Sequence, residues 1–198
     1  MGRRTGFLGV ALALWLFAGA AHAADPAATR VSAFCKGLIE AVRQSAGQGA
    51  QARVRRLEPL VEEAFNMKVM AQFAVGPPWT AMTAAEQANV TAALTRYGAG
   101  RFADEFDRFS GQTCVVDPLV QTRGPDTLVK SKILQPGQEP AALNFRLRDY
   151  GGAPKIVDVY YNGVSQLATE RADFAGVLRT GGAAALASRL NELTAKLR

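Results

Sequence analysis

The sequence has very few of the residues on which enzymes and metal sites commonly depend. Its 198 residues include one histidine, His22, and two cysteines, Cys35 and Cys114. We expect the segment that contains His22 to be removed. The remaining protein then has no imidazole to serve as a general base, to activate a serine or to bind a metal. Two cysteines without histidine make a poor metal site. We therefore expect no catalytic residue, no cofactor and no metal, and hence no enzyme.

Long hydrophobic runs are also scarce, and the one present lies at the beginning of the chain. Arg3 and Arg4 precede an apolar run from Phe7 to Ala21, and Ala21-His22-Ala23 has the small-x-small pattern of a signal-peptidase site. The run is short for a membrane span of ~20 residues, which argues against the alternative of a retained anchor. We expect residues 1–23 to be a cleaved signal peptide and residues 24–198 to form a single exported domain.

The two cysteines suit an exported chain, because disulfides persist in oxidising compartments. Cys35 lies early on a predicted helix and Cys114 at the beginning of a predicted strand. A bond between them would stabilise the fold by roughly 4 kcal/mol on the chain-entropy estimate. The sequence thus favours a disulfide, with two buried free thiols as the alternative.

The net charge of +6 is modest, and the basic residues are dispersed. Arg53, Arg55 and Arg56 form the one tight cluster. Such a distribution does not indicate nucleic-acid binding. It is compatible with passing contact with anionic lipid headgroups.

Apolar spacing in the first half of the chain and at its end predicts helices. Asn66 is a predicted N-cap, Thr83 with Glu86 reads as a capping box, and Pro59 predicts a kink or break near Leu57. A Gly181-Gly182 break separates the last two predicted helices. The predicted helical ranges are about 30–43, 50–65, 66–75, 84–109, 169–178 and 183–197.

Four segments between these helices alternate as strands do. They cover 113–123, bent around Asp117-Pro118, then 128–134, 141–149 and 155–161. Short links between neighbours predict an antiparallel meander. The fold class is therefore α+β, with a four-stranded antiparallel sheet packed with several helices.

The last predicted strand and the segment after it, Lys155–Phe174, are the centre of the prediction. Simple alternation places Ile156, Asp158 and Tyr160 on one face and Val157, Val159 and Tyr161 on the other. Apolar residues on both faces mean that both faces are covered. An Asn162-Gly163 turn follows, and Asp158 and Arg171 are candidates for an ion pair at this corner.

Apolar side chains are crowded between the second and the longest predicted helix. The alternatives are an ordinary core and a surface that repacks around variable apolar guests, for which methionine is well suited. The crowded residues are Phe65, Met67, Met70, Phe73, Val75, Trp79 and Met82.

Three stretches resemble the MlaC family of periplasmic phospholipid-binding proteins, also called the toluene-tolerance or ABC-transporter auxiliary family. The first is Phe65-Asn66-Met67 through Phe73–Gly76 to Trp79, with the helix after Thr83, and the second is the hairpin 120–132 with Thr122. The third consists of Lys155, Asp158, Val159, Gly163, Val164, Ser165, Arg171 and Phe174. Pro154, Pro77-Pro78 and Asn66 depart from the family pattern and favour a branch associated with hopanoid biosynthesis.

The resemblance implies a strongly twisted sheet and helices that enclose an apolar cavity for acyl chains. It further implies a periplasmic, monomeric carrier of phospholipid or hopanoid-type lipid between an inner-membrane ABC transporter complex and an outer-membrane lipoprotein complex. The alternative is a non-transporting interaction module with a filled core. The residues expected to line the cavity are Phe73, Val75, Trp79, Phe102 and Phe106 from helices, with Val129, Leu143, Phe145, Val159 and Tyr161 from the sheet.

Overall fold

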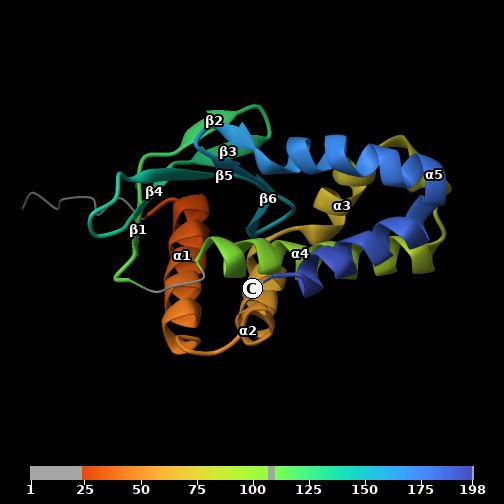
Figure 1. Cartoon of the computed structure of the whole chain (residues 1–198). Helices are drawn as coiled ribbons and strands as arrows, with labels where there is room; N and C mark the ends of the chain where they lie inside the picture. Colours follow the sequence, from red (N-terminus) through yellow and green to blue (C-terminus); the bar gives the residue numbers. More distant parts are fainter. Residues whose placement is uncertain (1–23, 107–109, 198) are drawn as a thin grey trace, which may run out of the picture.

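A computed structural model describes residues 24–106 and 110–197 (Figure 1). The predicted signal peptide, residues 1–23, and residues 107–109 of the longest predicted helix lie outside the described residues. Within the described ranges, no helix has the length and apolar character needed to cross a membrane. The described helices are α1 (Pro26–Gln44), α2 (Ala50–Ala64), α3 (Met67–Val75), the 3-10 helix η1 (Pro77–Ala81), α4 (Ala84–Glu105) and α5 (Gln166–Ala195).

Side-chain caps explain where several of these helices begin. The Asn66 carboxamide accepts a hydrogen bond from the Val69 amide at the start of α3, and Thr83 and Glu86 form the predicted capping box of α4. These contacts satisfy amide groups that have no partner within a helix. Helix α2 continues through Pro59 as one helix, so the chain does not break near Leu57.

The described ranges contain seven strands in one antiparallel sheet, not the predicted four. The fold class and the order of the meander are confirmed, but two predicted strands are each divided and a short one is added. The strands are β1 (Thr113–Val116), β2 (Gln121–Arg123), β3 (Asp126–Val129), β4 (Ser131–Leu134), β5 (Ala141–Asp149), β6 (Pro154–Tyr161) and β7 (Val164–Ser165).

Local chemistry explains where the predicted strands divide. Pro118, between β1 and β2, has no amide hydrogen to donate to a neighbouring strand. In the same place, the four residues 117–120 lie opposite only two residues, 129 and 130, so the regular pairing is interrupted. Between β3 and β4, the Ser131 amide donates to the Asn144 side chain at 3.1 Å, so a side chain replaces the main-chain acceptor. These interruptions bend the sheet over the helices (Figure 1).

A β-bulge in β6 corrects the predicted alternation of that strand. Arg146 of β5 pairs with Asp158, whereas the next residue, Leu147, pairs with Ile156, so Val157 is the extra residue. Cross-strand partners share a face, which places Ile156 with Val159 on the inner face and Asp158 on the opposite face. Ile156 and Asp158 therefore do not share a face, because the extra residue reverses the side-chain pattern.

Helix α5 consists of two arms joined at Gly182, whose φ of 63° and ψ of −155° are not helical. A positive φ of this kind is readily adopted only by glycine. Figure 1 shows one arm running outward from the sheet and the other returning alongside α4, with α3 close to both. The return is close because Gly100 of α4 has no side chain; a Cβ there would lie 2.5 Å from Leu197 Cδ1.

The core joins the helices to the inner face of the sheet through Phe34 of α1. Its ring lies 5.0 Å from that of Phe65, 5.2 Å from that of Phe102 and 5.9 Å from that of Phe145, all edge to face. Such pairs add to the free energy of burial. Next to Phe34, Cys35 forms a disulfide with Cys114 and so ties α1 to β1.

Candidate functional site

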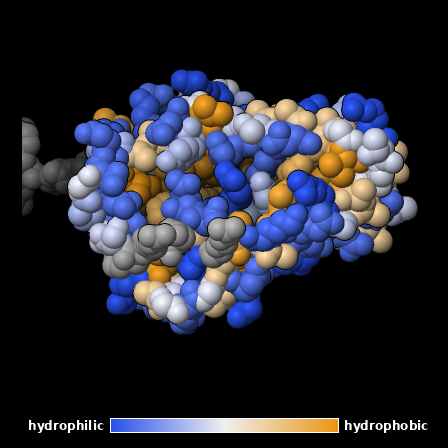
Figure 2. All heavy atoms as spheres, in the orientation of Figure 1, coloured by the Kyte–Doolittle hydropathy of each residue, from blue (hydrophilic) through white to orange (hydrophobic). Residues whose placement is uncertain are grey.

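A cavity of about 530 Å³ lies between the helices and the inner face of the sheet. The helices and the residues that directly follow α2 and α4 contribute Val61, Phe65, Met67, Met70, Leu94, Phe102, Phe106 and Leu167 to its apolar wall. The sheet contributes Ile133, Ala141, Leu143, Val159 and Tyr161. Figure 2 shows hydrophobic (orange) atoms recessed behind hydrophilic (blue) ones in the middle of one face of the molecule. The wall is thus suited to an apolar guest.

The sheet presents one face to this cavity, and its register fixes which residues lie there. Leu143 pairs with Tyr161 and Phe145 with Val159, so these four side chains point the same way. Val129, the partner of Phe145, lies on the same face. Five of the ten residues predicted to line the cavity do so: Phe102, Phe106, Leu143, Val159 and Tyr161.

The other five predicted lining residues lie elsewhere. Val129 and Phe145 are completely buried beneath the cavity, because α1 covers that part of the sheet and Phe34 packs on Phe145. Phe73 faces outward, 41% exposed, with the Arg171 guanidinium 5.0 Å from its ring centre. Val75 lines a different hollow, and Trp79 is buried in η1.

Sequence reasoning missed several lining residues that the fold brings together. Phe65, Met67 and Met70 belong to the crowded apolar segment, but it was not evident which of its members face inward. The Asn66 amide donates to the Ile156 carbonyl at 2.8 Å, and this bridge turns Phe65 and Met67 toward the cavity. Gly98 also lines the cavity, and no atom lies within 4 Å of the position its Cβ would take.

Polar groups gather among the lining residues that are exposed or, like Glu170, partly exposed. The charged ones are Arg101 and Glu105 near the end of α4, Glu139 in the loop between β4 and β5, and Glu170 on α5. The pKa of the Glu170 carboxyl is raised to about 7, chiefly by burial; Asp158 and Asp173 contribute to the rise, and Arg101 opposes it. Burial also raises the pKa of Tyr161, assisted by its hydrogen bond with Glu105.

A second, more open hollow of about 580 Å³ lies on another face of the first arm of α5. Its α5 residues are Ala168, Arg171, Ala172, Ala175, Leu178 and Arg179, and its other side is formed by Val75, Pro77 and Pro78. We call it the α5 groove. Its charged groups are both arginines.

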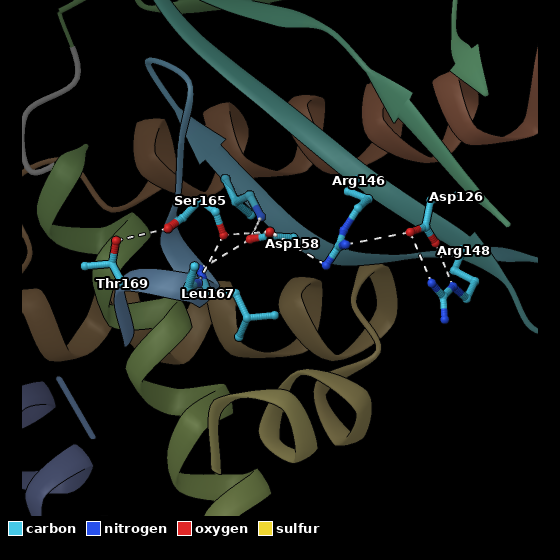
Figure 3. Close-up of polar contacts among 9 residues, drawn as sticks. Asp126, Arg146, Arg148, Asp158, Ser165, Leu167 and Thr169 are labelled. Atoms are coloured by element: carbon cyan, nitrogen blue, oxygen red, sulfur yellow. Dashed lines mark hydrogen bonds and ion pairs between the residues drawn. The ribbon is translucent and has the colours of Figure 1, made fainter. Parts of the chain in front are cut away.

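Figure 3 shows the polar contacts that fix the first arm of α5 to the sheet. The buried Asp158 carboxylate accepts hydrogen bonds from the Ser165 hydroxyl at 2.8 Å and from the Leu167 amide at 3.3 Å. Arg146, not the predicted Arg171, pairs with Asp158 at 3.8 Å, and it also lies 3.7 Å from Asp126. This chain of charges anchors the start of α5, and hence one wall of the cavity.

Within the described residues, no three His, Cys, Asp or Glu side chains are grouped to hold a metal ion. The distinctive property of the arrangement is an apolar cavity with a polar opening.

The family model described as MlaC protein matches residues 33–192. The chain belongs to the MlaC family. This is a family of lipid-binding proteins that are not enzymes, so the prediction that the chain is not an enzyme is confirmed. A comparison with curated proteins finds no match.

Among solved structures, the chain is similar to the phospholipid-binding protein from Ralstonia solanacearum, which was solved in complex with a phospholipid. The two share 23% sequence identity and a TM-score of 0.70, over 86% of this chain and 98% of the other. At this identity the likeness establishes the fold. The predicted resemblance to the MlaC family is thus confirmed, whereas a hopanoid-associated branch stays a prediction.

Proposed function

We propose that this protein is a periplasmic carrier that holds the acyl part of a phospholipid in the cavity between α4, α5 and the sheet. In this proposal residues 1–23 direct export, residues 24–198 act as one monomeric domain, and the lipid passes between an inner-membrane ABC transporter complex and an outer-membrane lipoprotein complex. Membership of the MlaC family and the phospholipid bound to the Ralstonia solanacearum protein support this role.

The volume and lining of the cavity carry the proposal. A volume of about 530 Å³ has room for about 18 groups the size of a water molecule, each filling ~30 Å³. A methylene group is of similar size, so one acyl chain fits. Burying about 16 methylenes at ~0.8 kcal/mol each stabilises the bound lipid by on the order of 10 kcal/mol. The second chain of a phospholipid would require the cavity to widen, which the flexible Met67 and Met70 side chains favour.

A hopanoid-type lipid is the second candidate ligand, since Pro154, Pro77-Pro78 and Asn66 depart from the family pattern. Its fused rings are rigid, and the cavity volume suits one such ring system as well as one acyl chain. The non-transporting module with a filled core is less compatible with the structure, because a filled core would leave no cavity of this size.

Native mass spectrometry of the purified protein, followed by lipid extraction, tests the carrier. We expect a lipid-bound mass for the native protein. Gly98→Trp should remove it, because the indole would enter the cavity from α4 without meeting another atom near Cβ. Extraction also separates the two ligands, since a phospholipid contains phosphorus and a hopanoid has a fused-ring mass.

Gly176→Trp is the matched control. Gly176 is also a helical glycine with no atom within 4 Å of the position that its Cβ would take, but it does not line the cavity. The control should retain its lipid. A lipid-free native protein that takes up nothing from labelled vesicles would overturn the proposal.

A further inference from the structure

The charge around the cavity is opposite in sign to that of the whole protein. The chain has a net charge of +6, yet the charged residues that line the cavity are one arginine, Arg101, and three glutamates, Glu105, Glu139 and Glu170. The glutamates come from α4, from the loop between β4 and β5, and from α5. They are brought together by the fold and do not form a cluster in the sequence.

These charges lie where a lipid headgroup would be. Arg101, Glu105 and Glu139 are exposed although they line the cavity, so they mark its opening. A carrier buries the acyl chain and leaves the headgroup in water, because removing a charged group from water is costly. The headgroup would therefore lie among these side chains.

The end of α4 adds to the negative character of the opening, and the start of α5 does little to offset it. Helix α4 ends at Glu105, and the carbonyl end of a helix carries a partial negative charge. The amide end of α5 would attract an anion, but its first amides already have acceptors. The Leu167 amide donates to Asp158 and the Ala168 amide to the Ser165 hydroxyl.

Arg101, the one cation that lines the cavity among the described residues, already interacts with neighbouring side chains. The positive charge of Arg101 opposes the rise in the pKa of the Glu170 carboxyl. Arg101 also forms a hydrogen bond with Tyr97. Even so, the pKa of Glu170 is raised to about 7, which shows that burial and the carboxylates of Asp158 and Asp173 outweigh this cation. An additional anion at the opening would be repelled by the carboxylates of Glu105 and Glu139, whereas an ammonium group would be attracted to them.

We propose that the cavity selects lipids whose headgroup carries an ammonium group over lipids whose headgroup is only anionic. This inference rests on the proposed carrier function. A zwitterionic headgroup can place its phosphate near Arg101 and its ammonium near Glu105 and Glu139. Exposed ion pairs are individually weak, so two or three of them together give roughly a five- to tenfold preference.

A competition between two lipids tests this selectivity. The lipid-stripped protein is incubated with vesicles of equal parts phosphatidylethanolamine and phosphatidylglycerol with the same acyl chains, repurified, and its bound lipids are counted by mass spectrometry. We expect a roughly five- to tenfold excess of phosphatidylethanolamine. The triple variant Glu105→Gln, Glu139→Gln, Glu170→Gln should bind the two lipids almost equally.

The matched control replaces three glutamates away from the cavity, Glu58→Gln, Glu62→Gln and Glu192→Gln, and should keep the native preference. A single change at an exposed loop position, Glu139→Lys, should shift selection toward phosphatidylglycerol, and it provides the test if the triple variant does not fold. Equal uptake of both lipids by the native protein would overturn the selectivity and leave the carrier intact. Uptake of neither lipid would overturn the carrier and the selectivity with it.

Discussion

The cavity and the α5 groove lie on two faces of the same helical arm and differ in almost every property. Leu167 and Glu170 of this arm line the cavity, and the inner face of the sheet forms the opposite wall. Three alanines and two arginines of the arm line the groove, and Val75, Pro77 and Pro78 form its other side. Their volumes, about 530 and 580 Å³, are similar. Volume alone therefore does not identify a site for an acyl chain.

The difference lies in what encloses each hollow. At the cavity, the sheet and α4 stand around the apolar wall, so a guest there is removed from water over more of its surface than at the more open groove. At the groove, small side chains leave space, but a guest would remain in contact with water and gain less from the hydrophobic effect, which follows the area removed from water. The residues predicted to line one site are divided among the cavity, the groove, the core and, for Phe73, the exposed surface.

The largest expected contrast is between Phe145 and Phe73, which were both predicted to line the cavity. Phe145→Ala should lower the free energy of unfolding by about 3–5 kcal/mol, because the ring is completely buried beneath the cavity. Phe73→Ala, next to the groove, should lower it by about 1 kcal/mol, since the ring is 41% exposed and its main partner is Arg171. Urea denaturation measures both. Similar losses would mean that the groove is packed as tightly as the core.

The next contrast concerns the contacts that hold the arm. Asp158→Ala should cost about 2–3 kcal/mol, because it leaves the Leu167 amide and Arg146 without their buried carboxylate. Arg171→Ala, on the groove side, should cost under about 1 kcal/mol, since its guanidinium stacks on a half-exposed ring. Thermal unfolding at neutral pH compares them. An equal loss at Arg171 would show that the groove, too, anchors α5.

A third contrast depends on pH. The pKa of Glu170 is raised from 4.5 to about 7 in the folded state, so between these values the native protein binds a proton that the unfolded chain has released. Stability then falls as the pH rises, and the penalty is complete above about pH 7. Glu170→Gln should remove it, with a gain of about 1–2 kcal/mol at pH 8 after allowance for partial exposure and almost none at pH 4.

Arg179→Gln is the corresponding change at the groove, and its effect on stability should be small and similar at pH 4 and pH 8. Urea denaturation at the two pH values checks both variants. A gain at Glu170→Gln that is the same at both pH values would contradict the assigned cause.

A last contrast is between two glycines, whose substitutions should have effects of opposite sign. Gly98→Ala should raise stability by up to about 1 kcal/mol, because alanine favours the helix and its methyl group would enter the open cavity. Gly76→Ala, next to the groove, should lower stability by about 1–2 kcal/mol, since Gly76 has a φ of 71° and a Cβ would lie 3.0 Å from the Arg171 side chain. Differential scanning calorimetry resolves both shifts. Two changes of the same sign would remove the distinction between an open and a filled position.

Much of the fold could be read from local patterns. The capping box at Thr83 and Glu86, the Asn66 cap and the break at Gly182 depend on residues near one another in the sequence, and all three are present. The number of strands could not be read in this way. Whether a segment such as 126–134 counts as one strand or two depends on Asn144, a residue of the partner strand.

The sequence by itself determined the helices, the antiparallel meander and the family, because these rest on local spacing and on framework residues such as Asp158 and Gly163. Tertiary structure alone decided which apolar side chains face the cavity. One extra residue in β6 reverses which side chains share a face, and the bend of the sheet separates Phe145 in the core from Leu143 at the cavity wall. It also decided the charge around the cavity, since three glutamates from distant segments line it on a basic protein.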